Sequence, residues 1–223
     1  MREVDRLKKL RTLYQLQMMG FRYFDDTAQN VPLDSDVATA LPDDLDTLRK
    51  TVEACHLCGL SKTRTHVVFG EGNPNATLMF VGEGPGQMED ETGRPFVGRA
   101  GQLLTRIIET TLQMRREEVY IANIVKCRPP KNRVPTEEEA TTCIPYLHKQ
   151  IEIVDPKIIV ALGATSYRYL SGDHHGSISK IRGEFIDFGG RTLLATFHPS
   201  YLLRNPSAKK MVYYDMLKVK AKL

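Results

Sequence analysis

Short apolar runs rich in β-branched residues recur along the chain, and their alternation with helical stretches restricts the fold more than any other feature. The runs are ATLMFVG, VYIANIV, KIIVALG and TLLATF, at residues 76–82, 119–125, 157–163 and 192–197. Stretches with helical character lie at 101–112, 136–154 and 164–172. Strands joined by helical crossovers form a mostly parallel sheet with helices on both faces. We therefore predict an α/β fold, a three-layer αβα sandwich around a short central sheet.

The first 45 residues differ in character from the rest. Within 3–23, leucine and methionine recur at helical spacing, which predicts an amphipathic helix. A polar stretch with proline and several aspartates follows and is typical of a linker. We interpret 1–45 as an accessory helix and linker that docks on the rest of the chain or binds a replication or repair protein. Residues 46–223 are then one domain, of a size that a single core supports.

The charge balance and the apolar runs bear on partners and location. The chain has 31 basic and 27 acidic residues, a net charge of +4 that suits a polyanionic partner without requiring one. No apolar run reaches the ~20 residues of a membrane span. The N-terminus lacks the continuous apolar core of a signal peptide. We expect a monomer that acts inside the cell, in the cytoplasm and at the nucleoid, where structural disulfides are rare.

Polar segments follow three of the four predicted strands. GEGPGQMED starts at residue 82, NIVKCRPP at 123 and FHPSYLLRNP at 197. In an open parallel sheet, ligands bind outside the carboxyl ends of the strands. We therefore expect these three segments to converge on one cleft.

Instead of contributing to such a cleft, the glycine turn at 82–86 could be a phosphate-binding loop or a tight turn with no ligand. A dinucleotide fingerprint requires G-x-G-x-x-G opening directly into a helix, but Gly86 comes one residue early and the next helical pattern starts near residue 100. The G-K-[ST] sequence of a P-loop is absent as well. A tight turn after a strand, with no ligand, remains open.

The four cysteines suit a metal site. Cys55 and Cys58 form a C-x2-C pair on a tight turn, and Cys127 and Cys143 follow far downstream. Four thiolates hold either zinc or an iron–sulfur cluster, and their spacing alone does not separate the two. Unrelated free thiols are the remaining interpretation.

Together, GEGPGQMEDETGRPFVGRAGQLL, NIVKCRPPKNR and HPSYLLRNP resemble the motifs of the family 4 uracil-DNA glycosylases, the iron–sulfur type. The resemblance runs from about Cys55 to the C-terminus. It implies a uracil-DNA glycosylase-like fold and a monofunctional repair enzyme that flips uracil out of DNA. Such an enzyme hydrolyses the N-glycosidic bond and leaves an abasic site for base excision repair. It also implies a 4Fe-4S cluster, with zinc as the alternative, on Cys55, Cys58, Cys127 and Cys143.

The resemblance assigns catalytic roles to two residues. Glu83 would hold or polarise the attacking water, although the better-known uracil glycosylases place an aspartate one residue later, where this chain has Gly84. His198 would donate a hydrogen bond to uracil O2 as negative charge develops on the leaving base.

Further residues would bind the base. Asn123 offers one amide donor and one acceptor, which complement uracil O4 and N3–H, whereas cytosine reverses that pattern. Phe96 would stack on the flipped base, and Gly82 and Gly84 would let the backbone approach it. Two nearby acids, Glu89 and Asp90, either narrow the pocket against the methyl group of thymine, or are solvated, or cap the next segment.

Other residues would contact DNA. Leu202 or Leu203 would enter the base stack in place of the uracil, and Arg204 would hold a phosphate. A basic run either meets phosphates or forms a solvated face: Lys126, Arg128, Lys131 and Arg133. The main alternative function is a non-catalytic binding module on the same fold, of the kind appended to polymerases. A pure binder does not need the set Glu83, Asn123 and His198, which argues against that alternative.

Overall fold

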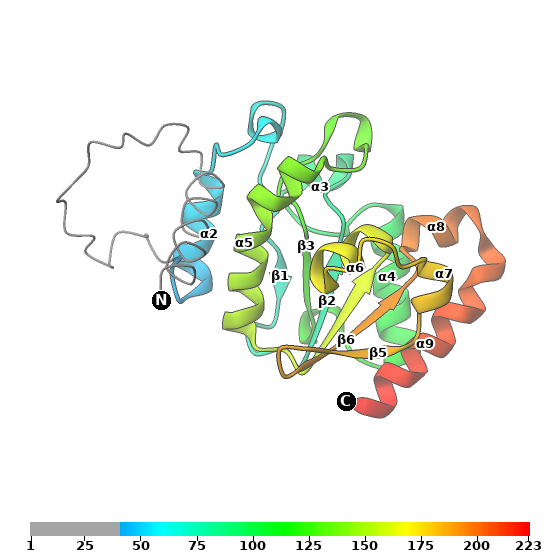
Figure 1. Cartoon of the computed structure of the whole chain (residues 1–223). Coiled ribbons are helices and arrows are strands. Elements are labelled where there is room, and N and C mark those ends of the chain that lie inside the picture. The colour runs from blue at the N-terminus through cyan, green and yellow to red at the C-terminus, as the bar shows by residue number, and fades with distance from the viewer. Residues whose placement is uncertain (1–40) are drawn as a thin grey trace, which may run out of the picture. The chain divides into compact units, whose positions relative to one another are not determined.

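The computed structural model describes residues 41–223. The helix predicted over 3–23 and most of its linker lie outside the described residues. Asp43–Leu223 form one compact unit. In this unit helices cover both faces of a six-stranded sheet with the order β1-β3-β2-β4-β6-β5 (Figure 1). The predicted α/β class and the mostly parallel sheet are confirmed.

All four predicted strands are present, and the pairings among them are parallel. They are β2 (Leu78–Gly82), β3 (Tyr120–Asn123), β4 (Ile158–Leu162) and β6 (Arg191–Thr196). Two edge strands that the sequence analysis missed pair in antiparallel fashion: β1 (Glu71–Gly72) and β5 (Phe185–Phe188). β1 has too few residues to leave a pattern, and β5 is half-buried and lacks a continuous apolar run.

Alternate residues of the strands face the two helical layers, as the two-residue period of a strand requires. Leu78, Phe80 and Val160 belong to the apolar cluster of one layer. Its helical elements are α4 (Arg99–Ile107), the π-helical turn η2 (Ile108–Leu112), α8 (Pro199–Arg204) and α9 (Lys209–Lys222). The other layer consists of α2 (Leu45–Glu53), α5 (Glu137–Val154) and α6 (Ala164–Ser171).

The short elements sit in the connections. They are the helices α3 (Gln87–Thr92) and α7 (Ile178–Ile181) and the 3-10 turns η1 (Gly59–Lys62), η3 (Arg116–Glu118), η4 (Pro130–Asn132) and η5 (Pro206–Ala208). α3 corrects the expectation that no helix follows the glycine turn before residue 100. It begins directly after Gly86 because the Glu89 carboxylate accepts the Gly86 N–H at 3.1 Å and so satisfies an N-terminal amide.

The order of the strands places a crevice at the carboxyl end of β2. From β2 the chain passes to β3 on one side and then returns to β4 on the other, so β2 is the point where the strand order reverses. Loops diverge at such a point and leave room for a ligand.

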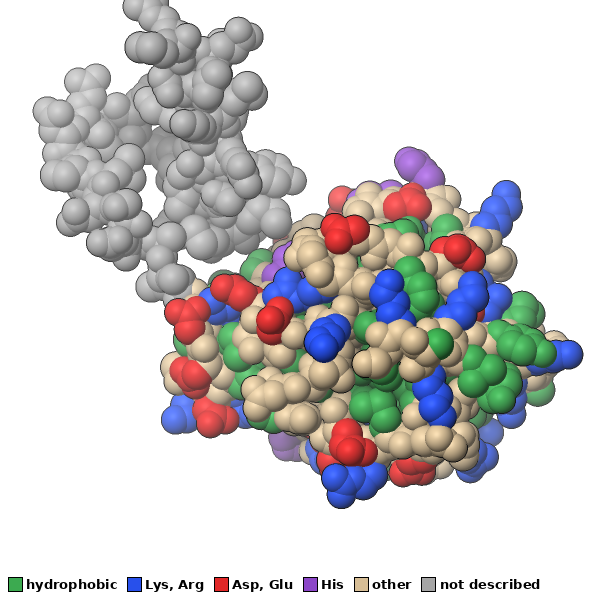
Figure 2. Space-filling model, turned by 90° about the horizontal axis from the view of Figure 1, so that it is seen from below, with side chains coloured by type: hydrophobic (Ala, Val, Ile, Leu, Met, Phe, Trp, Pro, Cys, Tyr) green, Lys and Arg blue, Asp and Glu red, His purple; other side chains and the backbone are tan. Residues whose placement is uncertain are grey.

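The described surface carries mixed charges. On the face shown in Figure 2, basic and acidic side chains are interspersed with apolar ones. Within residues 41–223, no helix has the length and apolar character needed to cross a membrane.

Candidate active site

A cavity of about 710 Å³ opens at the carboxyl ends of β2, β3, β4 and β6. The three polar segments expected to converge all contribute to its walls. The predicted residues that line it are Glu83, Gly84, Phe96, Asn123, His198 and Arg204. Residues more than a hundred positions apart in the sequence therefore meet in one site.

Gly82 packs tightly against Asn123 and Phe96, which line the cavity, but Gly82 itself does not line it. Gly82 and Asn123 are paired neighbours on β2 and β3. A Cβ atom at Gly82 would overlap both Asn123 Oδ1 and the Phe96 ring, so only glycine fits there. Within residues 41–223, Asn123 Oδ1 is buried without a hydrogen-bond partner. An unpaired buried acceptor is unfavourable, and a ligand N–H would satisfy it.

His198 presents a neutral hydrogen-bond donor. Its Nδ1 accepts the Ser200 N–H at 3.1 Å, where it also caps the N-terminus of α8. The single proton of a neutral imidazole is then on Nε2. Burial, assisted by the positive charge of Arg204 and opposed by Glu89, lowers the pKa of His198 to about 4. The ring centroid lies 5.7 Å from that of Phe96.

Glu83 is oriented by a residue that the sequence analysis missed. Thr165 Oγ1 donates to Glu83 Oε2 at 2.5 Å. Thr165 is in the first turn of α6, directly after β4, and also lines the cavity. The strand-end rule that selected the other segments applies equally to GATS at 163–166, so it would have identified this residue.

Glu89 and Asp90 make structural contacts. Glu89 Oε1 accepts the N–H groups of Val97 and Gly98, each at 2.9 Å, in addition to capping α3. Asp90 is buried, and its Oδ1 accepts the Thr65 N–H at 2.9 Å. Glu89 lines the cavity, but its carboxylate is engaged by backbone amides, which matches the capping alternative.

The two leucines of the last loop differ in exposure. Leu202 is 0% exposed and belongs to the core, so the expectation that it contacts DNA is corrected. Leu203 is 38% exposed. The side chains of adjacent helical residues point about 100° apart, which is why one leucine of α8 faces the core and the next faces solvent.

Part of the basic run is unavailable to phosphates. Lys126 is 1% exposed, and its Nζ donates to the Asn123 carbonyl at 2.9 Å. Arg133 forms two hydrogen bonds of 2.7 Å with the Glu139 carboxylate. Lys131 is exposed, and Arg128 is half-buried with its Nε donating to Asn132 Oδ1 at 2.8 Å.

The four cysteines surround a second, smaller cavity, together with Arg64, Lys126 and Tyr146. Arg64 Nη1 donates to Cys127 Sγ at 3.2 Å, and the Lys126 N–H donates to Cys143 Sγ at 3.3 Å. Each contact acts to lower the pKa of its thiol, but burial outweighs it and leaves the pKa of both Cys127 and Cys143 above the ordinary value. Burial raises the pKa of the Cys143 thiol to about 12. Among the described residues, no three His, Cys, Asp or Glu side chains are close enough together to hold a single metal ion.

Comparisons with protein families and with known proteins give matches over most of the chain. Residues 69–218 match the family model of the uracil DNA glycosylase superfamily. A type-4 uracil-DNA glycosylase of Thermotoga maritima is 51% identical over 180 residues, which span 79% of this chain and 93% of that protein. Type-4 uracil-DNA glycosylases of Saccharolobus solfataricus and Sulfurisphaera tokodaii are 46% identical over 188 residues and 45% over 185. These matches span 81% and 80% of this chain, and 87% and 84% of the relatives, respectively.

Proposed function

Because the chain belongs to the uracil-DNA glycosylase superfamily, with type-4 relatives across most of its length, we propose that it excises uracil from DNA at the cavity described above. Glu83, Asn123 and His198 act on the base and its sugar. The reaction is hydrolysis of the N-glycosidic bond, and it leaves an abasic site for base excision repair. The observation that carries the proposal is the unpaired Asn123 Oδ1 at the base of a cavity that also contains Glu83 and His198.

Asn123 selects the base. Uracil N3–H donates to Oδ1, which otherwise has no partner within residues 41–223, and the Asn123 amide donates to uracil O4. Cytosine presents an amino group and an unprotonated N3 at these positions, so both contacts would be lost. Phe96 stacks on the ring of the extruded base.

His198 stabilises the leaving group. As the glycosidic bond breaks, negative charge develops on uracil, and a fixed donor at O2 lowers the energy of that transition state. The Nε2–H of His198 is such a donor, because Nδ1 is occupied by the Ser200 amide. The low pKa of His198 keeps the imidazole neutral, so it stabilises the anion without first transferring a proton.

Glu83 acts on the sugar side. The developing oxocarbenium ion is stabilised by a nearby carboxylate, and the same group holds or polarises the attacking water. Thr165 occupies Oε2 and leaves Oε1 to bind that water. Gly84, where better-known uracil glycosylases have an aspartate, provides no second carboxylate.

Residues at the mouth of the cavity hold the DNA. The exposed Leu203 fills the gap left by the uracil, and Arg204, Arg128 and Lys131 contact phosphates. We expect the protein to act as an intracellular monomer on chromosomal DNA. Residues 1–45 are the segment we assign to a replication or repair partner.

The cysteine cavity is the proposed site of a 4Fe-4S cluster. Cys55, Cys58, Cys127 and Cys143 all face it, and N–H donors to two of the sulfurs fit thiolate ligands. A single zinc ion draws its ligands close together, with Zn–S bonds of about 2.3 Å, whereas a four-iron cluster holds its ligands further apart. The described residues contain no group of three ligands close enough for a single ion, and a cluster does not require one. When bound, the cluster supplies a structural cross-link.

An oligonucleotide with a single uracil tests the proposal. The protein is incubated with it, and hot alkali then cleaves any abasic site. We expect strand breakage at the uracil, none in a matched thymine oligonucleotide, and little with Glu83→Gln. DNA binding without breakage by the wild-type protein would instead support the binding-module alternative and overturn the glycosylase assignment.

A further inference from the structure

Phe96 has a backbone conformation that its side chain disfavours. Its φ angle is 51°, in the left-handed region that bulky residues seldom adopt. Such a conformation persists only where surrounding contacts fix it, and it is frequent at functional sites. Contacts on both sides of the residue hold Phe96 in this conformation.

On its C-terminal side, Phe96 is fixed by Glu89 and by a glycine. Glu89 Oε1 accepts the N–H groups of the next two residues, Val97 and Gly98. Gly101 in α4 approaches so closely that a Cβ atom there would overlap the Phe96 carbonyl. Both contacts come from residues near in sequence.

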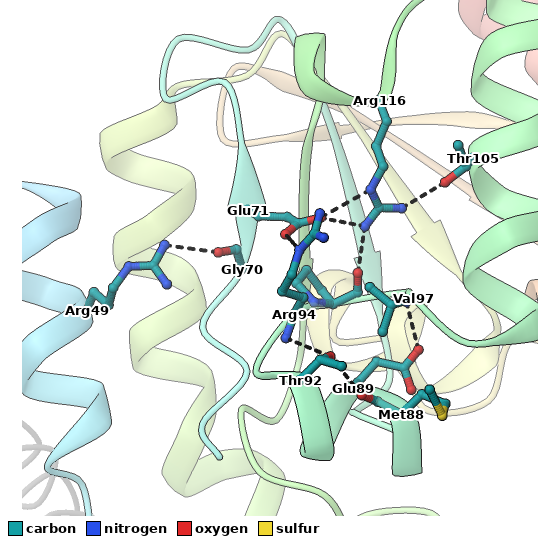
Figure 3. Close-up of polar contacts among 11 residues, drawn as sticks. Arg49, Gly70, Glu71, Met88, Glu89, Thr92, Arg94, Val97, Thr105 and Arg116 are labelled. Carbon is teal, nitrogen blue, oxygen red and sulfur yellow. Dashed lines mark hydrogen bonds and ion pairs between the residues drawn. The ribbon is translucent and has the colours of Figure 1, made fainter.

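On its N-terminal side, Phe96 is fixed by a residue distant in sequence. Arg116 Nη2 donates to the Pro95 carbonyl at 2.6 Å, and Nη1 donates to Thr105 Oγ1 at 2.9 Å (Figure 3). Nη2 also pairs with Glu71 Oε1 at 2.8 Å. One guanidinium thus joins β1, α4 and the loop that carries Phe96. The Arg116 side chain is only 12% exposed and does not line the cavity.

Glu71 holds Arg116 in place and is shared with a second arginine. Arg94 Nε pairs with Glu71 Oε2 at 2.8 Å, but the Arg94 side chain is 63% exposed. Within residues 41–223, its guanidinium binds Glu71 alone. Burial acts to raise the pKa of Glu71, but the hydrogen bonds from Arg94 and Arg116 outweigh it and hold the pKa below its ordinary value. The carboxylate therefore stays ionised.

We propose that Arg116, anchored by Glu71, is a positioning residue that holds Phe96 ready to stack on the extruded base. The inference rests on the proposed function, because it gives Phe96 its stacking role. A stacking ring that is already placed before the base arrives does not have to be ordered on binding. Loss of Arg116 would free the Pro95 carbonyl and let the loop move, while the catalytic groups stay in place.

Arg116→Gln and Arg94→Gln form a matched pair, since each removes one arginine from Glu71 and only the first releases Pro95. We expect Arg116→Gln to lower kcat/KM for uracil excision by about tenfold, and Arg94→Gln to change it less than about twofold. In a Phe96→Ala background, Arg116→Gln should have almost no further effect, because coupled residues are not additive. An equal loss in both backgrounds, or the same effect from both arginine variants, would overturn the inference.

A second readout does not depend on catalysis. The protein is labelled with 4-fluorophenylalanine, and the Phe96 resonance in the 19F NMR spectrum is assigned by its absence in Phe96→Leu. We expect this resonance to shift or broaden in Arg116→Gln but not in Arg94→Gln. If Arg116→Gln does not fold, Arg116→Lys, which keeps one charged donor, takes its place in both experiments. An unchanged resonance refutes the positioning role, whereas an inactive wild-type protein with the expected spectra refutes only the glycosylase assignment.

Discussion

His198 is suited to its role because its charge state is fixed by its surroundings. Burial is the main reason that the pKa of His198 falls from 6.5 to about 4. In the folded protein the ring stays neutral down to about pH 4, while in the unfolded chain it binds a proton near pH 6.5. The contribution of His198 to the unfolding free energy is therefore fully present above pH 6.5, and it is lost as the pH falls from 6.5 toward 4.

Urea unfolding of the wild type and His198→Gln at several pH values tests this sign. Between pH 7.5 and 4.5, the unfolding free energy of the wild type should fall more than that of the variant, because only the wild type has this titrating group. An equal fall in both proteins would show that His198 titrates normally. Excision by the wild type should likewise show no loss attributable to His198 until the pH nears 4.

Thr165 allows the orientation of Glu83 to be tested without removing the carboxylate. Thr165→Val keeps the shape of the side chain but removes the hydroxyl that donates to Glu83 Oε2. A hydrogen bond to a charged group contributes about 1.5–3 kcal/mol, so we expect kcat to fall about 10- to 100-fold. Thr165→Ser should restore most of the activity. Wild-type kcat in Thr165→Val would mean that the hydroxyl does not orient Glu83.

At the level of elements, the sequence predicted what has a strong local pattern. β2, β3 and β4 are buried on both faces, so each forms a continuous apolar run, and the helices between them have their own periodicity. The strand β1 and the helix α3 could not be predicted in this way. Each depends on partners elsewhere: β1 on its pairing with β3, and α3 on the Glu89 carboxylate that caps it.

For the candidate site, the sequence predicted which segments meet but not the contacts between distant residues. Strand ends indicated which segments meet, because parallel strands end at one edge of the sheet. Contacts across the fold left no such signal: Thr165 is 82 residues from Glu83, and Arg116 is 45 residues from Glu71. The burial of Leu202 depends on the rotation of a short helix, which two adjacent leucines do not specify.

Gly101 links helix α4 to the stacking loop, and its replacement tests that packing. In an open helix, Gly→Ala stabilises by about 1 kcal/mol. Here the new Cβ atom would overlap the Phe96 backbone, so we expect Gly101→Ala to lower the unfolding free energy by about 1–3 kcal/mol in urea titrations. The exposed neighbour Gln102 serves as the control, and Gln102→Ala should change it by less than about 0.5 kcal/mol. Stabilisation by Gly101→Ala would contradict the close approach.

For the whole described unit, the cysteine cavity joins segments that lie far apart in the sequence. Two of its thiols follow α2, the third follows β3, and Cys143 lies in α5. Metal binding at such a site contributes directly to folding. We therefore expect the cluster to stabilise the fold and to take no part in the reaction.

Cys143→Ser tests this structural role. We expect the brown colour and the iron and sulfide content to fall and the Tm to drop, while the excision rate per folded molecule changes little. Thr142→Ser is the control, because Thr142 lines the same cavity without a thiol. A colourless wild-type protein with one zinc ion per chain, purified without oxygen, would contradict the cluster assignment.

We propose that three loops from separate strand ends form one site for uracil excision. Its most direct test is the single-turnover release of free uracil from an oligonucleotide by Glu83→Gln, Asn123→Ala and His198→Ala, each compared with the wild type at equal folded concentration. Loss of a group that stabilises developing charge lowers a rate by about 100- to 1000-fold, and we predict a loss of at least about 100-fold per folded molecule in each variant. Release of uracil at the wild-type rate by all three variants would place the chemistry outside this cavity.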